Sequence, residues 1–430
     1  MKHRSAIAAS GHKFRTKNIS QRVQKIVISP IKEMSILADK LEERIGPGKI
    51  ISFGQGIPYL DTPSHIKTGA RNALNKISTA KYTLEPGITE LRNLVAEFLK
   101  KEKGIKNVKP KKEIMISVGC QEATACALAA TLDPGDEAII PSPTYASHIE
   151  QILQFNGAPK FAPMIENPPN GEGWHLNLKA FEKALTKKTK IVLLSNPSNP
   201  TGAVLSKQEL VELARFIKKH NLILISDETY DFLTYDGAKH VSAGSIPFIR
   251  DRVIVVSSFS KKYRMTGYRL GYAFANESII DHMLKVHDAL AICAPAISQE
   301  AGIIALKETE KSKKSVKELV KKMAINRKLM IEELDKLSEF LEYQKPTGAY
   351  YILARVNPPV DGPKKINSFK LALRILNEAG VIVIPGAAFG PSGENHIRFS
   401  FAGEPENIKK GFSRLKKWLE KWRKEGYNKI

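Results

Sequence analysis

Cysteine is scarce in this chain of 430 residues. The three cysteines, Cys120, Cys126 and Cys293, form no Cys-x-x-Cys pair, which speaks against a disulfide framework and against a zinc knuckle. This usage fits a reducing compartment, so we expect a cytoplasmic protein. Long apolar runs are also missing, because none approaches the roughly 18 residues that a membrane span needs. We therefore expect no membrane partner.

Acidic residues are few beside the basic ones: 44 Asp and Glu stand against 67 Lys and Arg, a formal net charge of +23. Such an excess makes nucleic-acid binding a rival function to weigh. The lysines are dispersed along the chain, however, and no zinc-finger, RRM or GXXG signature is present. The densest basic stretch, residues 409–424, predicts a helix docked by one face, because apolar residues recur at helical spacing: Ile408, Phe412, Leu415, Leu419 and Trp422. We expect no nucleic-acid partner.

Short apolar runs that end in polar or glycine clusters fill the middle of the chain. They are Ile114 to Val118, Ala138 to Ile140, Ile191 to Leu194, Leu222 to Ile225 and Val253 to Val256. Runs of this kind without alternation are typical of strands buried on both faces. Helix-like segments such as Ser206 to His220 separate them. This alternation predicts an α/β fold with a mostly parallel sheet covered on both faces.

The alternation of apolar runs and helix-like segments ends after about Leu306. A Lys/Glu-rich helical stretch from about Glu310 to Phe340 leads into a second α/β region. We therefore expect a large domain over residues 62–306 and a smaller α/β domain made of residues 1–61 and 307–430.

Residues able to do chemistry follow the predicted strands, where ligands of parallel sheets bind. Taken singly they are weak signals, because Lys261 could be a surface lysine, Asp227 a helix cap, Tyr145 a core residue and Arg398 half of a surface ion pair. Together with Arg269 they suit one chemistry. Pyridoxal phosphate (PLP) needs an amine that forms a Schiff base, an acidic partner for its pyridinium nitrogen, a flat side chain against its ring and a phosphate-binding cup.

At these residues the sequence resembles the class I aminotransferases of PLP fold type I, the aspartate/aromatic aminotransferase-like enzymes. The resemblance covers about Ser29 to Trp418 and keeps the family's order of motifs. The motifs are Gly56-Ile57-Pro58; Tyr82 with Gly87 and Leu91-Arg92; Asn196-Pro197-Ser198-Asn199-Pro200-Thr201-Gly202; Ser226-Asp227-Glu228-Thr229-Tyr230; Ser258-Phe259-Ser260-Lys261 with Gly267, Arg269 and Gly271; Pro385-Gly386-Ala387-Ala388-Phe389-Gly390; and Ile397-Arg398-Phe399-Ser400.

The resemblance implies a role for each catalytic residue. Lys261 would hold PLP in a Schiff base and then move the proton of the substrate Cα; Lys262 is the alternative, but the family's spacing to Arg269 selects Lys261. Asp227 would keep the pyridine nitrogen protonated so that the ring accepts electrons. Tyr230 would hydrogen-bond the phenolate oxygen of the cofactor, as would Asn199.

The resemblance also implies how the phosphate and the ring are bound. Ser258, Ser260 and Arg269 would hold the phosphate, and backbone N–H groups around Cys120 and Gln121 would add donors at a helix N-terminus. The remaining contact, stacking on the ring face, would come from Tyr145.

Substrate and partner contacts complete what the resemblance implies. Arg398 would clamp the substrate α-carboxylate by a bidentate fork, and the Gly56 backbone would approach the same group. Asn199 is also expected to contact the substrate. Tyr82 resembles a residue that reaches the phosphate of the neighbouring subunit, which implies a homodimer. Gln121 stands where some aspartate-preferring members carry a lysine, and this favours an enzyme that is not strictly specific for dicarboxylates. Arg264 also departs from the family pattern, as does the Tyr59-Leu60 pair.

The resulting hypothesis is a PLP-dependent aminotransferase with a ping-pong mechanism. The donor would be an L-amino acid (aspartate, alanine or aromatic) and the acceptor a 2-oxo acid, with 2-oxoglutarate expected. A C–S β-lyase or a cyclopropane-forming synthase of the same fold would keep Lys261, Asp227 and Arg398 and is the main alternative. A PLP-binding regulator would need an added DNA-binding domain, and we expect none because too few residues precede Pro30.

Overall fold

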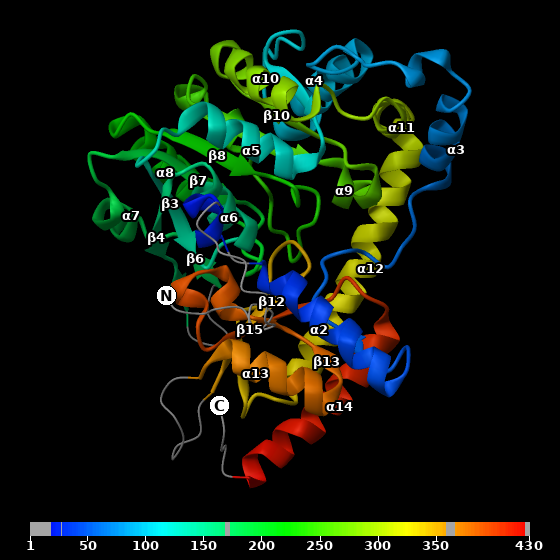
Figure 1. The fold of residues 1–430 in the computed structure, drawn as a ribbon, viewed down its shortest axis with the longest axis vertical. Helices are drawn as coiled ribbons and strands as arrows, with labels where there is room; N and C mark the ends of the chain where they lie inside the picture. The colour runs from blue at the N-terminus through cyan, green and yellow to red at the C-terminus, as the bar shows by residue number, and fades with distance from the viewer. Residues whose placement is uncertain (1–18, 27, 168–172, 358–365, 426–430) are drawn as a thin grey trace.

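The structure is a computed structural model, and it describes residues 19–26, 28–167, 173–357 and 366–425. Its centre is a seven-stranded sheet (Figure 1). In spatial order the strands are β2 (Ile114–Ser117), β10 (Gly271–Phe274), β9 (Val253–Ser258), β8 (Ile223–Asp227), β7 (Thr189–Ser195), β3 (Glu137–Ser142) and β4 (Ala158–Pro163). The five strands from β9 to β4 run parallel, whereas β10 is antiparallel to both of its neighbours.

The inner strands are buried on both faces, as the unalternating apolar runs predict. In β7, Val192 and Leu194 join one hydrophobic cluster while Ile191 and Leu193 join a second cluster on the opposite face. Both clusters take side chains from the covering helices. The predicted α/β fold with a mostly parallel sheet is therefore confirmed, and each predicted strand lies within two residues of an observed one.

Two layers of helices sandwich this sheet. One layer comprises α5 (Gly119–Thr131), α6 (Ala146–Gln154) and α10 (Glu277–Ala291). The other comprises α3 (Ser64–Ala73), α4 (Thr89–Lys103), α7 (Leu178–Ala184), α8 (Lys207–Lys219) and α11 (Ala296–Lys307). Helix α8 matches the predicted segment because Ser206 and Glu209 form a capping box at its start.

A second, antiparallel sheet lies below the large sheet in the view of Figure 1. Its strands, in order, are β11 (Leu341–Tyr343), β12 (Tyr351–Val356), β15 (His396–Ser400) and β14 (Ile384–Pro385). Four helices contribute to its hydrophobic cluster: α2 (Pro30–Ile45), α12 (Thr309–Asp335), α13 (Ser368–Arg374) and α14 (Pro405–Lys424). The shorter elements of the chain are α1 (Gln21–Lys25), α9 (Phe259–Lys262), β1 (Ile51–Ser52), β5 (Ile165–Glu166), β6 (Trp174–His175) and β13 (Val381–Ile382).

The N-terminal segment joins the C-terminal part of the chain, because β1 pairs in parallel with β13. This pairing supports the predicted composition of the small domain, although its residues 1–18, 27, 358–365 and 426–430 lie outside the described part. The domain boundaries at 61/62 and 306/307 stay a prediction. One correction concerns α12, which ends at Asp335 rather than near Phe340. The backbone N–H groups of Leu337 and Phe340 donate to carbonyl oxygens three residues earlier, so the chain turns there to enter β11.

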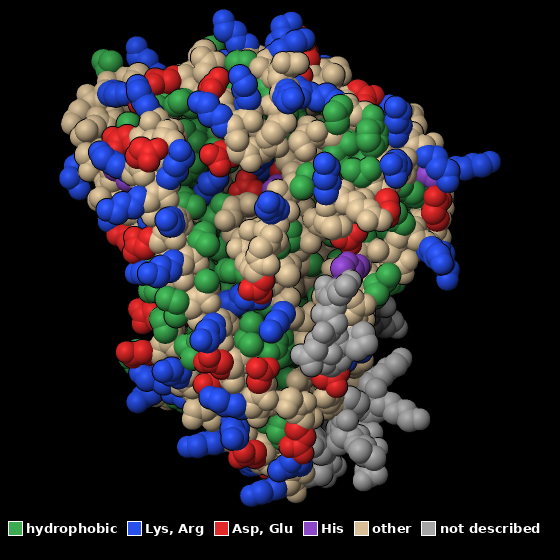
Figure 2. Space-filling model, turned by 180° about the vertical axis from the view of Figure 1, so that it is seen from behind, with side chains coloured by type: hydrophobic (Ala, Val, Ile, Leu, Met, Phe, Trp, Pro, Cys, Tyr) green, Lys and Arg blue, Asp and Glu red, His purple; other side chains and the backbone are tan. Residues whose placement is uncertain are grey.

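The basic residues are spread over the surface. On the face seen from behind, Lys and Arg side chains are scattered with acidic side chains between them (Figure 2). In α14 the lysines face outward, while Ile408, Phe412, Leu415, Leu419 and Trp422 are buried, as predicted. Within the described residues, no helix is long and apolar enough to cross a membrane.

Candidate active site

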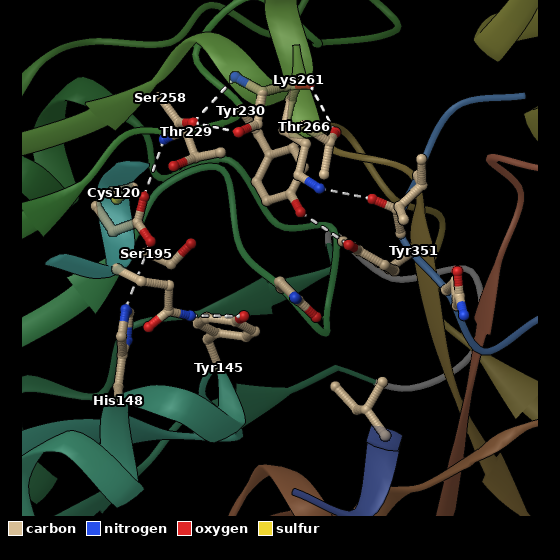
Figure 3. A pocket seen from close by; sticks show the side chains of 18 of the residues that line it. Cys120, Tyr145, His148, Ser195, Thr229, Tyr230, Ser258, Lys261, Thr266 and Tyr351 are labelled. Carbon is tan, nitrogen blue, oxygen red and sulfur yellow. Dashed lines mark hydrogen bonds and ion pairs between the residues drawn. The ribbon is translucent and has the colours of Figure 1, made fainter. Parts of the chain in front are cut away.

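A cavity of about 640 Å³ lies where the ends of β7, β8 and β9 face the small sheet (Figure 3). The strand ends contribute Ser195, Asp227 and Ser258, and the small sheet contributes Tyr351 and Arg398. All of the predicted site residues except Tyr82 line this cavity: Gly56, Cys120, Gln121, Tyr145, Asn199, Asp227, Tyr230, Ser258, Ser260, Lys261, Arg269 and Arg398. The side chain of Tyr82 lies elsewhere, and the residue is 77% exposed.

Lys261 points into the cavity from α9, the short helix that follows β9 (Figure 3). Its Nζ donates to the carbonyl oxygen of Gly56 at 2.8 Å. Burial, reinforced by the positive charge of Arg269, lowers the pKa of Lys261 to about 8. Lys262, the alternative in the sequence, instead places its Nζ 4.2 Å from the ring centroid of Phe98, outside this cavity.

Asp227 ends β8 and is held by two donors. The backbone N–H of Thr229 donates to Oδ1 at 3.0 Å, and His148 Nε2 lies 3.5 Å from Oδ2. Burial raises the pKa of Asp227, but the hydrogen bonds and the nearby imidazole outweigh it, so this pKa lies below its usual value. The carboxyl group is therefore held ionised inside the cavity. The sequence interpretation missed His148, which follows Tyr145 by three residues at the start of α6.

Tyr351 contacts both Tyr230 and Arg398. Like His148, it is a cavity residue that the sequence interpretation missed. The hydroxyl groups of Tyr230 and Tyr351 are 2.8 Å apart, and burial raises the pKa of Tyr230 well above its usual value. The guanidinium carbon of Arg398 lies 4.5 Å from the ring centroid of Tyr351. Its Nη1 donates to Asn199 Oδ1 at 3.0 Å. These contacts place four polar side chains on one wall of the cavity.

Arg398 is a cation that is only 1% exposed. Among the described residues no carboxylate forms an ion pair with it, and its Nε has no hydrogen-bond partner. Burial accordingly lowers its pKa. A buried guanidinium without a counter-ion is costly, so the site suits a bound anion.

A further group of donors surrounds the N-terminus of α5. The hydroxyls of Ser258 and Ser260 lie 2.7 Å apart, and Arg269 approaches the start of the helix. At Gly119 the φ of +76° favours glycine, and a Cβ there would lie 2.6 Å from Arg269 Nη2, so the guanidinium lies close to the backbone at the start of the helix. Serine hydroxyls, a guanidinium and a helix N-terminus together form a typical phosphate cup.

On the opposite wall, Tyr145 presents its ring to the cavity (Figure 3). Gln121 Nε2 donates to Tyr145 Oη at 2.9 Å, which holds the ring in place. Cys120 lines the same wall, and burial raises the pKa of its thiol well above the usual value. The thiol is therefore a poor nucleophile. The group that Cys120 can offer to a ligand is its backbone N–H at the N-terminus of α5.

Comparisons with known proteins agree with this site. Residues 48–415 match the family model described as aminotransferase class I and II. The chain is 35% identical to aromatic-amino-acid aminotransferase 2 of Thermococcus litoralis, over 94% of this chain and 98% of that protein. It is 36% identical to an aspartate aminotransferase of Pyrococcus abyssi, over 93% of this chain and 98% of that protein. The aspartate aminotransferase of Thermus thermophilus solved with maleate superposes with a TM-score of 0.84 at 32% identity, over 93% and 99% of the two chains.

The chain therefore belongs to the class I and II aminotransferase family. It is a PLP-dependent aminotransferase, since enzymes of this family and fold use that cofactor. The cavity fits the group: it offers an amine of lowered pKa, an ionised carboxylate and the phosphate cup of α5.

Proposed function

We propose that this aminotransferase moves the amino group of an L-amino acid to a 2-oxo acid by a ping-pong mechanism. Aspartate, alanine and aromatic amino acids are the candidate donors, and 2-oxoglutarate is the candidate acceptor. The observation that carries the proposal is that Lys261, Asp227 and Arg398 line one cavity although they come from three separate elements, α9, β8 and β15. The names of two of the relatives above, an aromatic and an aspartate aminotransferase, support these donors.

Lys261 is proposed as the residue that carries protons. When bound, PLP supplies an aldehyde and an electron-accepting pyridine ring. Lys261 Nζ would hold the cofactor through this aldehyde, and its amine, when free, would move the proton of the substrate Cα. A pKa of about 8 keeps a useful fraction of this amine neutral near pH 7, as a base requires.

Asp227 and Tyr230 are proposed to set the charge of the ring. The ionised Asp227 carboxylate, supported by His148, keeps a proton on the pyridine nitrogen. Tyr230 Oη and the Asn199 amide donate to the phenolate oxygen of the cofactor. Tyr351 positions Tyr230 through the 2.8 Å contact between their hydroxyl groups. With these groups in place, Asp227 would stay ionised and Tyr230 would stay protonated beside the bound ring.

The remaining groups are proposed to bind the phosphate, the ring and the substrate. Ser258, Ser260, Arg269 and the α5 N-terminus at Cys120 and Gln121 hold the phosphate, and Tyr145 stacks on the ring. Arg398 binds the α-carboxylate of every substrate, because this anion satisfies its buried charge and its unpartnered Nε. Gly56 admits the same carboxylate, since a Cβ there would lie 1.8 Å from Tyr351 Oη and close the approach.

A homodimer is proposed because Tyr82 faces away from the cavity of its own chain. Tyr82 is 77% exposed, and the nearby Leu74, Ile77 and Leu84 are 63%, 82% and 70% exposed. A group of exposed apolar side chains is typical of a surface that another protein chain covers. The proposed cover is a second copy of this chain, whose phosphate cup Tyr82 completes.

The absorbance spectrum of the PLP-loaded protein tests the proposal. Single amino acids are added without any oxo acid, and each accepted donor is expected to remove the visible band of the bound cofactor. A 2-oxo acid is then expected to restore the band, which shows both halves of a ping-pong reaction. If the band persists while pyruvate and ammonia accumulate, the C–S β-lyase alternative is correct. Lys261→Ala provides the control that transfers no amino group.

A further inference from the structure

The cavity is lined by more cations than the proposed chemistry uses. Four basic side chains, Lys32, Lys261, Arg269 and Arg398, line it together with a single acid, Asp227. The proposed function assigns Lys261 to the cofactor aldehyde, Arg269 to its phosphate and Arg398 to the α-carboxylate. Lys32 has no assigned role, and no carboxylate among the described residues forms an ion pair with it.

Helix α2 brings Lys32 to the cavity by its N-terminal end. The helix begins at Pro30, and Ile31, Lys32 and Ser35 from its first two turns line the cavity. In Figure 3 the end of this helix, in blue, lies at the lower edge of the pocket. Its opposite face is anchored in the core by Met34 and Ala38, among others, so the position of Lys32 is fixed by packing. The positive end of the helix dipole adds to the charge of the lysine.

Among the described lining residues, the wall opposite α2 offers no cation for a second carboxylate. Gln121 stands on that wall, but its side chain is neutral and its amide is already used in the 2.9 Å hydrogen bond to Tyr145. A dicarboxylic substrate whose α-carboxylate binds Arg398 still needs a positive partner for its side-chain carboxylate. Lys32 is the remaining cation of the lining, and it is exposed to solvent.

We propose that Lys32 binds the side-chain carboxylate of dicarboxylic substrates, both amino acids such as aspartate and oxo acids such as 2-oxoglutarate. This inference rests on the proposed function and assigns its specificity to α2. Ile31, one residue earlier, presents an apolar surface to the same cavity. Monocarboxylic substrates with apolar side chains pack there without using Lys32. The N-terminal end of α2 therefore serves both classes of substrate. It binds dicarboxylic substrates through the charge of Lys32 and apolar monocarboxylic substrates through contact with Ile31.

The test compares Lys32→Met with Lys40→Met, a matched control on the same helix that is exposed and does not line the cavity. In Lys32→Met, the KM for 2-oxoglutarate and aspartate is expected to rise about three- to fivefold, the size typical of an exposed ion pair. The KM for pyruvate and phenylalanine is expected to stay unchanged, and kcat with each substrate to stay close to that of the parent enzyme. Lys32→Arg keeps the charge and is expected to retain the parent values.

Calorimetry on the PLP-loaded enzyme gives a readout that needs no turnover. The affinity for succinate is expected to fall in Lys32→Met, whereas the affinity for butyrate is expected to stay constant. Equal effects on both acids, or no effect on succinate, would overturn the assignment of Lys32 and leave the proposed aminotransferase function standing. If the parent enzyme transfers no amino group between any donor and acceptor, the proposed function itself is wrong, and the role of Lys32 falls with it.

Discussion

Lys261 Nζ donates a hydrogen bond of 2.8 Å to the carbonyl oxygen of Gly56, although 205 residues separate the two in the chain. The same carbonyl accepts a second hydrogen bond from Tyr350 Oη at 2.6 Å. Lys261 follows a strand of the large sheet, whereas Tyr350 immediately precedes a strand of the small sheet. The Gly56 carbonyl thus ties the proposed catalytic amine to the small sheet. Alignment of the amine depends on how both sheets pack.

The first prediction concerns the pH at which Lys261 becomes reactive. Its pKa lies at about 8, below the usual value of 10.5, because burial and Arg269 disfavour the charged form. Only the neutral amine attacks an aldehyde, so the rate at which PLP attaches to the cofactor-free protein is expected to rise with pH up to about 8 and then level off. Stopped-flow absorbance measures this rate. A midpoint near 10.5 would contradict the effect of burial, and Lys261→Ala should show no attachment at any pH.

The second prediction is that Asp227→Asn slows the reaction while PLP stays bound. The amide has the shape of the carboxylate but lacks its charge, so the proton on the pyridine nitrogen is no longer favoured. The single-turnover rate with aspartate is expected to fall about a hundredfold or more, a loss typical of removing one electrostatic contact. Asp251→Asn, which changes a carboxylate outside the cavity, serves as the control. A near-normal rate in Asp227→Asn would remove Asp227 from the proposed site.

The third prediction is that Arg398→Lys raises the KM for every donor. A lysine ammonium cannot reproduce the two parallel hydrogen bonds of a guanidinium to a carboxylate, and it loses the contact with Asn199. We expect an increase of about tenfold, equal for aspartate and phenylalanine because both carry the α-carboxylate. Steady-state kinetics with several donors measures it. Arg414→Lys, at the exposed contact of Arg414 with the Lys49 carbonyl, is the control. An effect on one donor alone would assign Arg398 to a side-chain group instead.

Short apolar runs predict five of the seven strands of the large sheet, together with the polar residues that follow them, whereas β4 and β10 are not predicted. For β7 and β8 the predicted and observed bounds differ by at most two residues. Helix α12 is the exception: its apolar spacing continues through Leu337 and Phe340, but both residues are buried in turns rather than in the helix. Apolar spacing alone therefore does not show where this helix ends, because its last apolar residues pack against the same core after the chain has turned.

Side chains that reach the cavity through tertiary packing are what the sequence interpretation misses. Tyr351 opens β12 and contacts Tyr230, which is 121 residues away. Lys32 and Ile31 reach the cavity only because α2 packs on the small sheet. No local motif records these long-range contacts. His148 is different, since its spacing of three residues from Tyr145 at the start of one helix could have indicated a shared face.

A buried ion-pair cluster lies behind the segment that carries Asp227 and Tyr230. Lys103 Nζ lies 2.9 Å from Glu228 Oε2 and 2.7 Å from Asp231 Oδ2, and its side chain is only 2% exposed. Burial alone would lower the pKa of Lys103, but the two carboxylates raise it well above its usual value. None of these three residues lines the cavity. The cluster therefore holds the segment 228–231, which follows β8, from outside the cavity.

The fourth prediction is that Lys103→Met destabilises the fold and loosens the cofactor. The variant leaves the Glu228 and Asp231 carboxylates buried without their cation, which costs about 3–5 kcal/mol of the free energy of unfolding. Urea unfolding measures this loss, and dialysis followed by absorbance measures the faster release of PLP that a displaced Asp227 would cause. The matched control is Lys101→Met, whose ion pair with Glu97 is exposed and is worth less than about 1 kcal/mol. If both variants unfold at the same urea concentration, the buried cluster does not hold the segment 228–231.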